Sequence, residues 1–436
     1  MLSQSIIERN LKGKCSCALL SILSLYMYSV GAEKNKVNSK ADAVVIGAGP
    51  TGLFSALTMA RKDLDVVVCE EHKEVGLPNH CAGHISVKGL KQLGINLPPD
   101  VVENEIRGAV FCSPSGYELR LRVASPVTLV INRAFFDKHL ARLAQEAGAR
   151  ILLGTKVETL QFSSKFITGV TLRNGGKLSS RIVIDTEGVA STFLKQADLQ
   201  QFDRRHVVSA VQGEVEHVDD VENDLVEVYP GQHFAPGLFA WIIPRRNGSA
   251  KIGLATKTGN PREFFKHFLH AHPNVKKKLS FRKVKNISYH LIPLGGPISR
   301  TYSNGFLVAG DAASQVKPTT GGGVIMGLTC AKIAGETACE AMRLGNFTES
   351  FLAQYQSAWK NEIGFDMMVM KRIRLMLNSL SDHRLDGIIR LCSQLQVSES
   401  FQKVRDIDFQ GRALLPIFRS PRAWAVFFYF FLASIM

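Results

Sequence analysis

The segment VVIGAGPTG, residues 44–52, constrains the fold of this chain more than any other feature. An apolar run leads into three glycines, and the apolar residues that follow predict a helix over Leu53–Arg61. Gly47 would allow a tight turn, Gly49 would let backbone N–H groups approach a pyrophosphate, and Gly52 would let the helix pack closely on the strand. The helix N-terminus would then face the phosphates with its partial positive charge. This spacing predicts a dinucleotide site on a Rossmann-type unit.

An acidic side chain follows the next predicted strand. Asp65–Cys69 is mostly apolar and ends directly before Glu70, eighteen residues after Gly52. A carboxylate at about this distance accepts the ribose hydroxyls of an adenosine in dinucleotide-binding folds. Strand, helix and acid therefore agree on one cofactor-binding unit. The residues expected to line the cofactor at this end are Gly47, Gly49, Pro50, Thr51, Gly52, Glu70 and Glu71.

A second glycine-rich stretch, FLVAGDAASQVKPTTGGG at Phe306–Gly323, indicates which dinucleotide is bound. We expect a buried strand at Gly305–Ala309 and a long apolar helix at Val324–Met342. Asp311, directly after the strand, would suit the ribityl hydroxyls of a flavin. N–H groups at the helix start would reach the edge of the flavin ring that becomes negative on reduction. NAD has no use for this distant element, so the sequence predicts FAD, with further contacts from Asp311, Gly321, Gly322, Gly323 and Val324.

The 436 residues are too many for one simple core, so we expect two closely joined domains and a tail. The predicted fold class is α/β, in an α+β two-domain arrangement. A Rossmann-type FAD-binding domain is interleaved with an antiparallel-sheet substrate domain, and a C-terminal helical region follows. The expected FAD domain comprises residues 41–97, 132–199 and 304–344, the substrate domain 98–131 and 200–303, and the helical region 345–436. Short alternating runs within Ile151–Asp185 predict a small antiparallel meander.

Charge and cysteine usage limit the partners. The net charge of +15 indicates an anionic partner, such as a phospholipid surface, a phosphate-bearing substrate or an acidic electron donor such as ferredoxin. The sequence contains no zinc finger, aromatic RNA-binding signature or basic repeat, so we do not expect nucleic-acid binding. The eight cysteines form no CxxC pair. This argues against a disulfide framework and against a metal site, and it favours a reducing compartment.

Both ends of the chain are apolar. Residues 1–40 contain Cys17–Val30, which is compatible with a secretory signal, a membrane anchor or an over-extended start. Export conflicts with FAD, which is normally loaded in the cytoplasm. Ala423–Met436 has fourteen residues, fewer than the roughly 20 that a helix needs to span a bilayer, so it is predicted to contact the membrane interface. We therefore expect a cytoplasmic protein that associates peripherally with a membrane.

Other segments carry a resemblance to known flavoproteins. With the two glycine-rich stretches, Arg133 in NRAFFDKHLARLA and the IDTEGVAS segment (Ile184–Ser191) make the chain resemble the FAD family with the para-hydroxybenzoate hydroxylase fold. The resemblance implies that Arg133 holds the pyrophosphate. Glu187 stands where this family usually has Asp.

Two motifs make the resemblance more specific. HCAGHIS contains a CxGxxS pattern with Cys81, Gly83 and Ser86. APGLFAWIIP (Ala235–Pro244) is similar to PxxYxWxFP, with Phe239 in place of the Tyr of the pattern and Ile243 in place of its Phe. From about Ala41 to Leu344 the chain thus resembles the geranylgeranyl reductase family, and especially its archaeal members, which act on digeranylgeranylglycerophospholipids.

The resemblance implies an FAD-dependent oxidoreductase acting on CH–CH groups. It would hydrogenate isoprenoid double bonds of geranylgeranyl lipids or prenyl diphosphates by adding a proton and a flavin hydride. Cys81 and Ala82 would lie beside the flavin, with Cys81 helping to deliver the proton and His80 or His84 as alternative relays. Aromatic rings would line an alkyl tunnel and stabilise a cation. The residues expected in catalysis are Cys81, His84, Ser86, Phe239 and Trp241.

Several alternatives remain open at this level. FAWIIP is one residue from the WxWxIP pattern of flavin-dependent halogenases, in which Phe239 would have to be Trp. A flavin monooxygenase of the same fold is a stronger alternative, because fold alone does not fix function. A membrane-associated electron-transfer flavoprotein and a flavin-binding scaffold without turnover are further candidates. No second GxGxxG unit is visible, so the electron donor would be transiently bound NAD(P)H or reduced ferredoxin.

Overall fold

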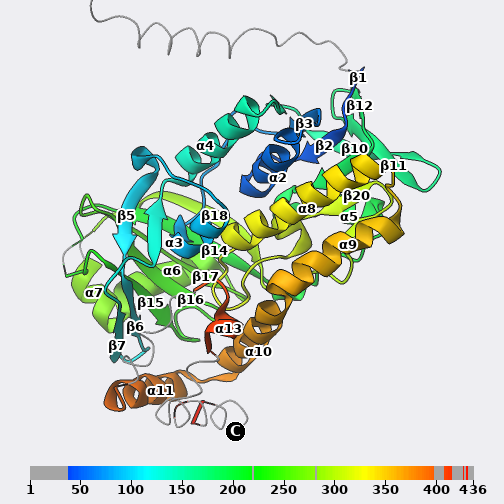
Figure 1. Ribbon diagram of the computed structural model, residues 1–436. Coiled ribbons are helices and arrows are strands. Elements are labelled where there is room, and N and C mark those ends of the chain that lie inside the picture. Colours follow the sequence, from blue (N-terminus) through cyan, green and yellow to red (C-terminus); the bar gives the residue numbers. More distant parts are fainter. Residues whose placement is uncertain are drawn as a thin grey trace, which may run out of the picture. The chain divides into compact units, whose positions relative to one another are not determined.

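The structure is a computed structural model that describes residues 38–218, 220–279, 282–396, 407–414, 426 and 429–430. The leader expected at residues 1–40 lies outside this range except for β1 (Asn38–Lys40), which belongs to a sheet. The apolar tail expected at Ala423–Met436 lies outside it except for three residues. The described chain is a mixed α/β protein built on two large sheets (Figure 1), which confirms the predicted fold class.

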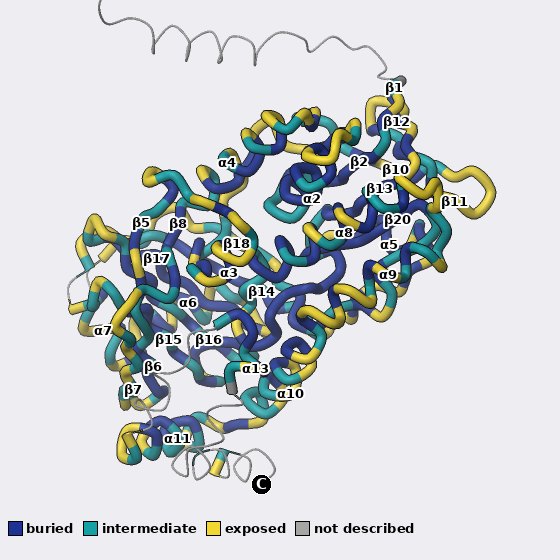
Figure 2. The backbone as a smooth tube through the Cα atoms, in the orientation of Figure 1, coloured by how far each residue is buried: buried dark blue, intermediate teal, exposed yellow. Residues whose placement is uncertain are grey.

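The first large sheet has six strands in the order β19-β20-β13-β2-β3-β9. All neighbouring strands are parallel except the pair β19–β20. The four inner strands are short, almost wholly apolar and buried on both faces, as a parallel sheet requires. Figure 2 shows β2, β13 and β20 deep in the interior. The strands are β2 (Ala43–Ile46), β3 (Val66–Cys69), β9 (Arg150–Leu152), β13 (Ile182–Asp185), β19 (Tyr302–Ser303) and β20 (Phe306–Val308).

Alternate residues of these strands pack on different layers. Val45 and Ile184 belong to a hydrophobic cluster with three helices, whereas Val44 and Val183 belong to a cluster with a small four-stranded sheet. The three helices are α2 (Pro50–Ala60), α4 (Arg133–Glu146) and α8 (Val324–Leu344). The small sheet contains the predicted antiparallel meander, in the order β1-β12-β11-β10, with β10 (Val157–Ser163), β11 (Phe166–Leu172) and β12 (Lys177–Ser179). The helix predicted at Leu53–Arg61 begins earlier, because Pro50 suits the first turn of a helix.

The second large sheet has seven strands in the order β18-β14-β17-β16-β15-β6-β7. Its pairs are antiparallel except for β15–β6. Helix α6 (Pro261–Ala271) covers it through Phe265 and Phe268, and α7 (Pro273–Leu279) covers it through Val275. The strands are β6 (Gly108–Cys112), β7 (Glu118–Arg122), β14 (Val207–Val215), β15 (Leu225–Pro230), β16 (Phe239–Pro244), β17 (Ala250–Thr256) and β18 (Lys285–Pro293).

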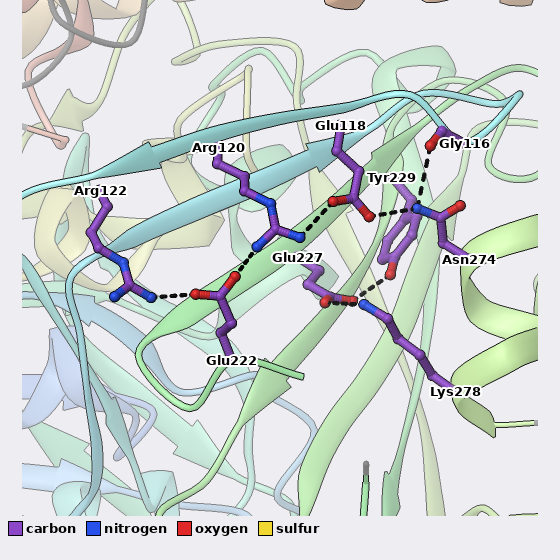
Figure 3. Close-up of polar contacts among 9 residues, drawn as sticks. All are labelled: Gly116, Glu118, Arg120, Arg122, Glu222, Glu227, Tyr229, Asn274 and Lys278. Atoms are coloured by element: carbon purple, nitrogen blue, oxygen red, sulfur yellow. Dashed lines mark hydrogen bonds and ion pairs between the residues drawn. The ribbon is translucent and has the colours of Figure 1, made fainter. Parts of the chain in front are cut away.

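Ion pairs hold the edge of this sheet in place (Figure 3). Glu222 bonds to both Arg120 and Arg122 of β7, and Arg120 also pairs with Glu118 at 2.7 Å. Asn274 of α7 donates to Glu118 at 2.8 Å. The charged residues of β7 alternate with Leu119 and Leu121, which line the central cavity described below. The network therefore fixes one wall of that cavity.

A three-stranded sheet combines strands from the two expected domains. Its order is β4-β8-β5, with β4 (His84–Ser86), β5 (Val102–Ile106) and β8 (Thr128–Ile131). β4 comes from the segment that we expected in the FAD domain, and the other two strands come from the expected substrate domain. The CxGxxS loop therefore lies on a short sheet shared by both segments.

The C-terminal region is helical, as expected. A π-helical turn at Lys360–Gly364 joins α9 (Glu349–Trp359) to α10 (Phe365–Ser379), and α11 (Asp382–Gln394) and α13 (Gln410–Leu414) follow. The remaining short helices are α3 (Val87–Gln92) and α5 (Phe193–Gln196). Within the described residues, every helix is too short or too polar to cross a membrane.

Candidate FAD and substrate cavity

One large cavity, of about 1760 Å³, joins most of the residues singled out in the sequence. Both glycine-rich loops, the CxGxxS loop and the aromatic strand β16 line it. Its far part is lined by α10 and α11. Because pockets for one drug-sized ligand typically measure roughly 300–1,000 Å³, this cavity has room for a cofactor together with a second molecule.

The first glycine-rich loop has the geometry expected of a phosphate cradle. Gly47 has a φ of +95°, and an added Cβ would lie 2.7 Å from the Thr186 carbonyl oxygen. At Gly52 an added Cβ would lie 2.0 Å from the Gly47 carbonyl oxygen, so only glycine lets α2 approach β2 this closely. At Gly49 an added Cβ would meet nothing within 4 Å, and this residue lines the cavity with Pro50 and Thr51.

The second glycine-rich loop lies directly against the first. An added Cβ at Gly310 or at Gly327 would lie 2.7 Å and 2.5 Å, respectively, from Thr51 Oγ1. Burial raises the pKa of Asp311 to about 6, although Arg133 opposes this shift. Asp311 lines the cavity together with Gly321, Gly322, Gly323 and Val324. Two segments about 260 residues apart in the sequence therefore form one site.

The acidic residues after β3 also lie at the cavity. Glu70 Oε2 accepts a hydrogen bond from the Ala48 N–H at 2.8 Å, which ties the acid to the first glycine-rich loop. Glu71 pairs with Lys156 at 2.5 Å, and this contact lowers the pKa of Glu71. Glu70 Oε1 also accepts from the His72 N–H at 2.9 Å and lies 2.6 Å from His72 Nδ1, so both acids at this end of the cavity already have partners within the protein.

Arg133 lines the cavity from the start of α4, but its guanidinium is already paired. Its Nε and Nη2 each donate to Asp137, at 3.1 Å. Burial raises the pKa of Asp137 although Arg133 opposes this shift. Asp137 therefore holds the guanidinium of Arg133 in one orientation at the cavity wall.

These residues fit FAD. The helices α2 and α8 begin at the cavity with Gly49 and Gly323 as N-caps, and neither has a side-chain cap. Their first N–H groups are therefore available to phosphate oxygens and to the flavin ring edge. By contrast, a side chain caps α3, α4, α6, α9 and α11. The free space at Gly49 would accommodate the pyrophosphate that the sequence predicts there.

The CxGxxS loop forms the cavity wall beside this site. Cys81 Sγ accepts from the Gly83 N–H at 3.4 Å, and it lies close enough to Arg133 and Lys251 to interact with their charges. Gly83 has a φ of +71°, and an added Cβ would lie 2.2 Å from the Ile131 carbonyl oxygen. Ala82 lines the cavity next to Cys81. The glycine of the motif is therefore required for this close backbone approach.

His84 and Ser86 complete the loop. His84 lines the cavity and is otherwise surrounded by protein. Burial, and to a smaller extent the charge of Lys317, lowers the pKa of its imidazole to about 4. His84 Nε2 lies 2.6 Å from Thr128 Oγ1. Ser86 is buried, and its Oγ accepts from the Gly89 N–H at 2.9 Å as the N-cap of α3. The hydrogen bond of Ser86 therefore stabilises the start of α3 and the conformation of the loop before it.

Trp241 and Phe239 lie on β16 and both line the cavity. Their ring centroids are 6.2 Å apart in an edge-to-face arrangement. The indole N–H of Trp241 donates to Gln212 Oε1 at 3.3 Å. An added Cβ at Gly253 would lie 2.5 Å from the indole, so glycine on the neighbouring strand makes room for the ring.

The structure also shows charged residues in or beside the cavity that the sequence did not single out. Lys251 is buried under the CxGxxS loop, bonded to Glu103 at 2.9 Å and to the Ile131 carbonyl oxygen at 3.1 Å. Lys317 pairs with Asp408 at 2.7 Å, deep beside His84. A lysine inside the otherwise apolar strand AKIGLAT was a usable signal for Lys251. The Lys317–Asp408 pair joins residues 91 positions apart, so no local pattern marks it.

His290 is a further cavity residue, and it stacks on His80. The ring centroids are 4.1 Å apart, with an angle of 17° between the planes. Burial is the main cause that lowers the pKa of each imidazole to about 4, and Arg133 lowers both further. Because these values lie below the ordinary 6.5, the unfolded chain takes up protons first as the pH falls. Stability that is fully present above pH 6.5 is lost as the pH approaches 4.

We expect His290→Gln to flatten this acid sensitivity. The variant removes one depressed imidazole and relieves His80 of a neighbouring charge, so the unfolding free energy should fall less steeply between pH 6.5 and 4. Urea unfolding of both proteins across this window measures the slopes. His383→Gln, at an exposed position of α11, is the control and should keep the wild-type slope. Equal slopes for wild type and His290→Gln would refute the expectation.

Within the described residues, no cluster of three or more His, Cys, Asp or Glu side chains could hold a metal ion.

Comparisons with known proteins agree on one family. Residues 40–357 match the model of the FAD binding domain family. The chain is 34% identical over 362 residues to Digeranylgeranylglycerophospholipid reductase 2 of Methanothermobacter thermautotrophicus, covering 80% of this chain and 91% of that protein. It is 31% identical to Digeranylgeranylglycerophospholipid reductase 2 of Methanopyrus kandleri, covering 80% and 89%.

Solved structures share the fold. A geranylgeranyl bacteriochlorophyll reductase-like protein from Thermoplasma acidophilum superposes with a TM-score of 0.80 at 23% identity, covering 90% of this chain and 99% of that one. A flavin-dependent brominase superposes with a TM-score of 0.68 at 16% identity, covering 91% and 100%. At these identities both similarities show the fold alone, so the similarity to the brominase does not support a halogenase function. The family match and the relatives above 30% identity decide the matter: the chain binds FAD and belongs to the geranylgeranyl reductase family of oxidoreductases.

Proposed function

We propose that this protein hydrogenates carbon–carbon double bonds in the geranylgeranyl chains of glycerophospholipids. One observation carries the proposal: a single cavity holds both FAD loops and a largely apolar extension lined by Trp241, Phe239 and the helices α10 and α11. A long isoprenoid chain needs such an apolar slot beside the flavin. The relatives named digeranylgeranylglycerophospholipid reductases support this substrate class.

The substrate bond limits what the side chains must do. A trisubstituted alkene is not polarised, so a proton must reach the less substituted carbon and leave a tertiary cation. Reduced FAD, when bound, supplies the hydride. Trp241 and Phe239 would stabilise the cation through their ring faces by roughly 0.5–2 kcal/mol. The bond from Trp241 to Gln212 holds the indole in one orientation, and a bound hydrocarbon chain would displace water from the mostly apolar lining.

Cys81 is the proposed proton donor. Its Sγ lies near the charged groups of Arg133 and Lys251, at the cavity wall beside the FAD loops. His84 has a lowered pKa and is neutral near pH 7, so it would act as a relay and not as a stored acid. Ser86 would support the loop from its position as the N-cap of α3.

The test is anaerobic turnover followed by mass spectrometry. The FAD-loaded protein, reduced chemically, is mixed with digeranylgeranylglyceryl phosphate, and the lipid mass should rise in steps of two hydrogens. Anaerobic conditions separate this reaction from that of a monooxygenase, which needs oxygen. A scaffold or an electron carrier would oxidise or hold its flavin without any change in the lipid mass, and that result would sink the proposal.

Cys81→Ala, measured in parallel, tests the proton donor. We expect normal FAD content and a loss of lipid reduction. Unchanged reduction in this variant would remove Cys81 from the mechanism and leave the reductase function standing.

We further propose peripheral contact with an anionic membrane and an external reductant, either NAD(P)H or reduced ferredoxin. The net charge of +15 and a lipid substrate favour the membrane contact. We expect the wild-type protein to sediment with vesicles containing anionic phospholipid, and to be released as salt rises. Equal binding to zwitterionic vesicles, insensitive to salt, would contradict the electrostatic contact.

A further inference from the structure

Arg374 of α10 is a buried cation that lacks a partner among the described residues. It is 6% exposed, and its Nη2 makes no hydrogen bond within the part of the chain that the structure describes. Burial lowers the pKa of its guanidinium to about 10, so the group is still charged near pH 7. An unpaired charge in the interior weakens a folded protein, because the lost hydration is not replaced. Its presence calls for an anion that the described residues do not supply.

Arg374 faces the cavity and not the packed core. The buried face of α10 runs through Asp366, Met367 and Met370 to Arg374, at the spacing of successive helical turns. The two methionines pack in the core cluster, whereas Arg374 and its neighbour Ile373 line the cavity. Arg374 therefore lies beside cavity space that a ligand could occupy.

Polar groups surround this end of the cavity. Asn378 lies one turn after Arg374 on the same helix and also lines the cavity. Gln232 lines it from the opposite side, with its Nε2 donating to the Asn378 carbonyl oxygen at 3.3 Å. The Gln232 N–H donates to Asp382 at 2.6 Å, which fixes the loop.

The wall of this part of the cavity is apolar. Leu119 and Leu121 of β7 contribute one side, and Ile388 and Ile389 of α11 contribute another. The ion pairs in Figure 3 hold β7 in position from its charged side. Together these residues give this part of the cavity apolar walls beside the cation of Arg374, which suits an amphiphile with an anionic end. Arg107, Arg122 and Glu227 also line the cavity, but Arg122 is paired with Glu222 and Asp224, and Glu227 with Lys278.

We propose that Arg374 binds the phosphate of an isoprenoid substrate whose hydrocarbon chain lies along this apolar wall toward Trp241. This proposal rests on the proposed function and adds a residue that recognises the head group of the substrate. A planar guanidinium can donate two parallel hydrogen bonds to one phosphate, which fixes direction as well as charge. An anchored phosphate would set which double bond of the chain reaches the flavin site. The phosphate could belong to a glycerophospholipid or to a prenyl diphosphate.

The experiment uses the full-length FAD-loaded protein and two pairs of probes in uncharged detergent. Digeranylgeranylglyceryl phosphate is paired with digeranylgeranylglycerol, and geranylgeranyl diphosphate with geranylgeraniol. For Arg374→Met we expect KM for the phosphate probes to rise by about 10- to 100-fold with little change in kcat. KM for the alcohols should stay at the wild-type value. Arg372→Met, at an exposed position of the same helix, is the matched control and should behave as wild type.

Two further readouts separate ligand binding from structural support. Calorimetric binding of geranylgeranyl diphosphate, which needs no turnover, should weaken in Arg374→Met and be partly restored in Arg374→Lys. The Tm of Arg374→Met without substrate should equal or exceed that of wild type, because the variant removes an unpaired buried charge. A structural arginine would give the opposite, a lower Tm with equal losses for phosphates and alcohols, and that result would overturn the proposal.

The two phosphate sources are distinguished by which probe depends on Arg374. If only the KM for digeranylgeranylglyceryl phosphate rises in Arg374→Met, the site recognises the lipid head group. If only the KM for geranylgeranyl diphosphate rises, it recognises a prenyl diphosphate. Either result supports phosphate recognition. Unchanged binding of both would refute it. If the wild-type protein reduces none of the four probes, the proposed function fails, whereas the calorimetric comparison still decides the role of Arg374.

Discussion

Gly52→Ala is expected to abolish FAD binding by separating α2 from β2. An added Cβ would lie 2.0 Å from the Gly47 carbonyl oxygen and 2.6 Å from Thr186 Oγ1, and neither backbone nor hydroxyl can move without shifting the strand end. Overpacking of this kind costs at least roughly 1–3 kcal/mol, and here it falls on the turn that would hold the pyrophosphate. We expect FAD affinity to drop by roughly 100-fold or more, equivalent to about 3 kcal/mol. Flavin absorbance of the purified protein and the Tm of the apoprotein measure the two effects.

Two glycine variants serve as controls for this result. Gly49→Ala places its Cβ in open space, so the apoprotein should keep its Tm, yet the methyl group would occupy cofactor space and FAD should be lost. Gly364→Ala lies in the π-helical turn before α10, where the nearest atom to an added Cβ is 3.5 Å away, so it should keep both Tm and FAD. A Gly52→Ala protein with wild-type flavin content and Tm would show that the loop is less tightly packed than the structure indicates.

Lys317→Met is expected to cost about 3–5 kcal/mol of unfolding free energy, since it breaks a buried ion pair and leaves a carboxylate inside the protein. Lys317 Nζ lies 2.7 Å from Asp408 Oδ1, with the two side chains 11% and 2% exposed. The backbone of Lys317 also stabilises the loop before α8, because its carbonyl oxygen accepts a hydrogen bond from the Gly321 N–H at 2.9 Å. Nearby, Thr319 donates to Gln410 at 2.6 Å. Loss of the pair should therefore loosen the second FAD loop as well, and denaturant unfolding with flavin titration measures both losses.

The double variant Lys317→Met with Asp408→Leu distinguishes pairing from general damage. Replacing both partners removes the buried carboxylate together with the lysine, so part of the stability should return and the two substitutions should be strongly non-additive. Lys332→Met, an exposed lysine of α8, controls for the change in net charge. A loss below about 1 kcal/mol in the single variant would place the pair among weak surface contacts and contradict this account.

The sequence alone identified the parts of the molecule whose chemistry depends on local spacing. Gly47 and Gly52 mark a tight turn between strand and helix, because a side chain at either position would collide with nearby backbone, and β2 and α2 follow from the apolar runs beside them. The long helix after Gly323 was predicted for the same reason, and its observed end is two residues beyond the expected one. Such patterns are short-range, so they can be recognised before the chain is folded.

The tertiary structure alone decided which distant groups meet. The packing of sheets and helices determines three such features: the stacking of His80 on His290, the pairing of Lys317 with Asp408 and the burial of Arg374. No local sequence pattern predicts contacts between residues so far apart in the chain. The same packing made β4 part of a sheet with β5 and β8, and so placed Cys81 beside Arg133 and Lys251. The sequence thus determined that the chain binds FAD, since that depends on backbone geometry within a few residues. The charges and walls around the cavity were decided by burial, which only the folded chain creates.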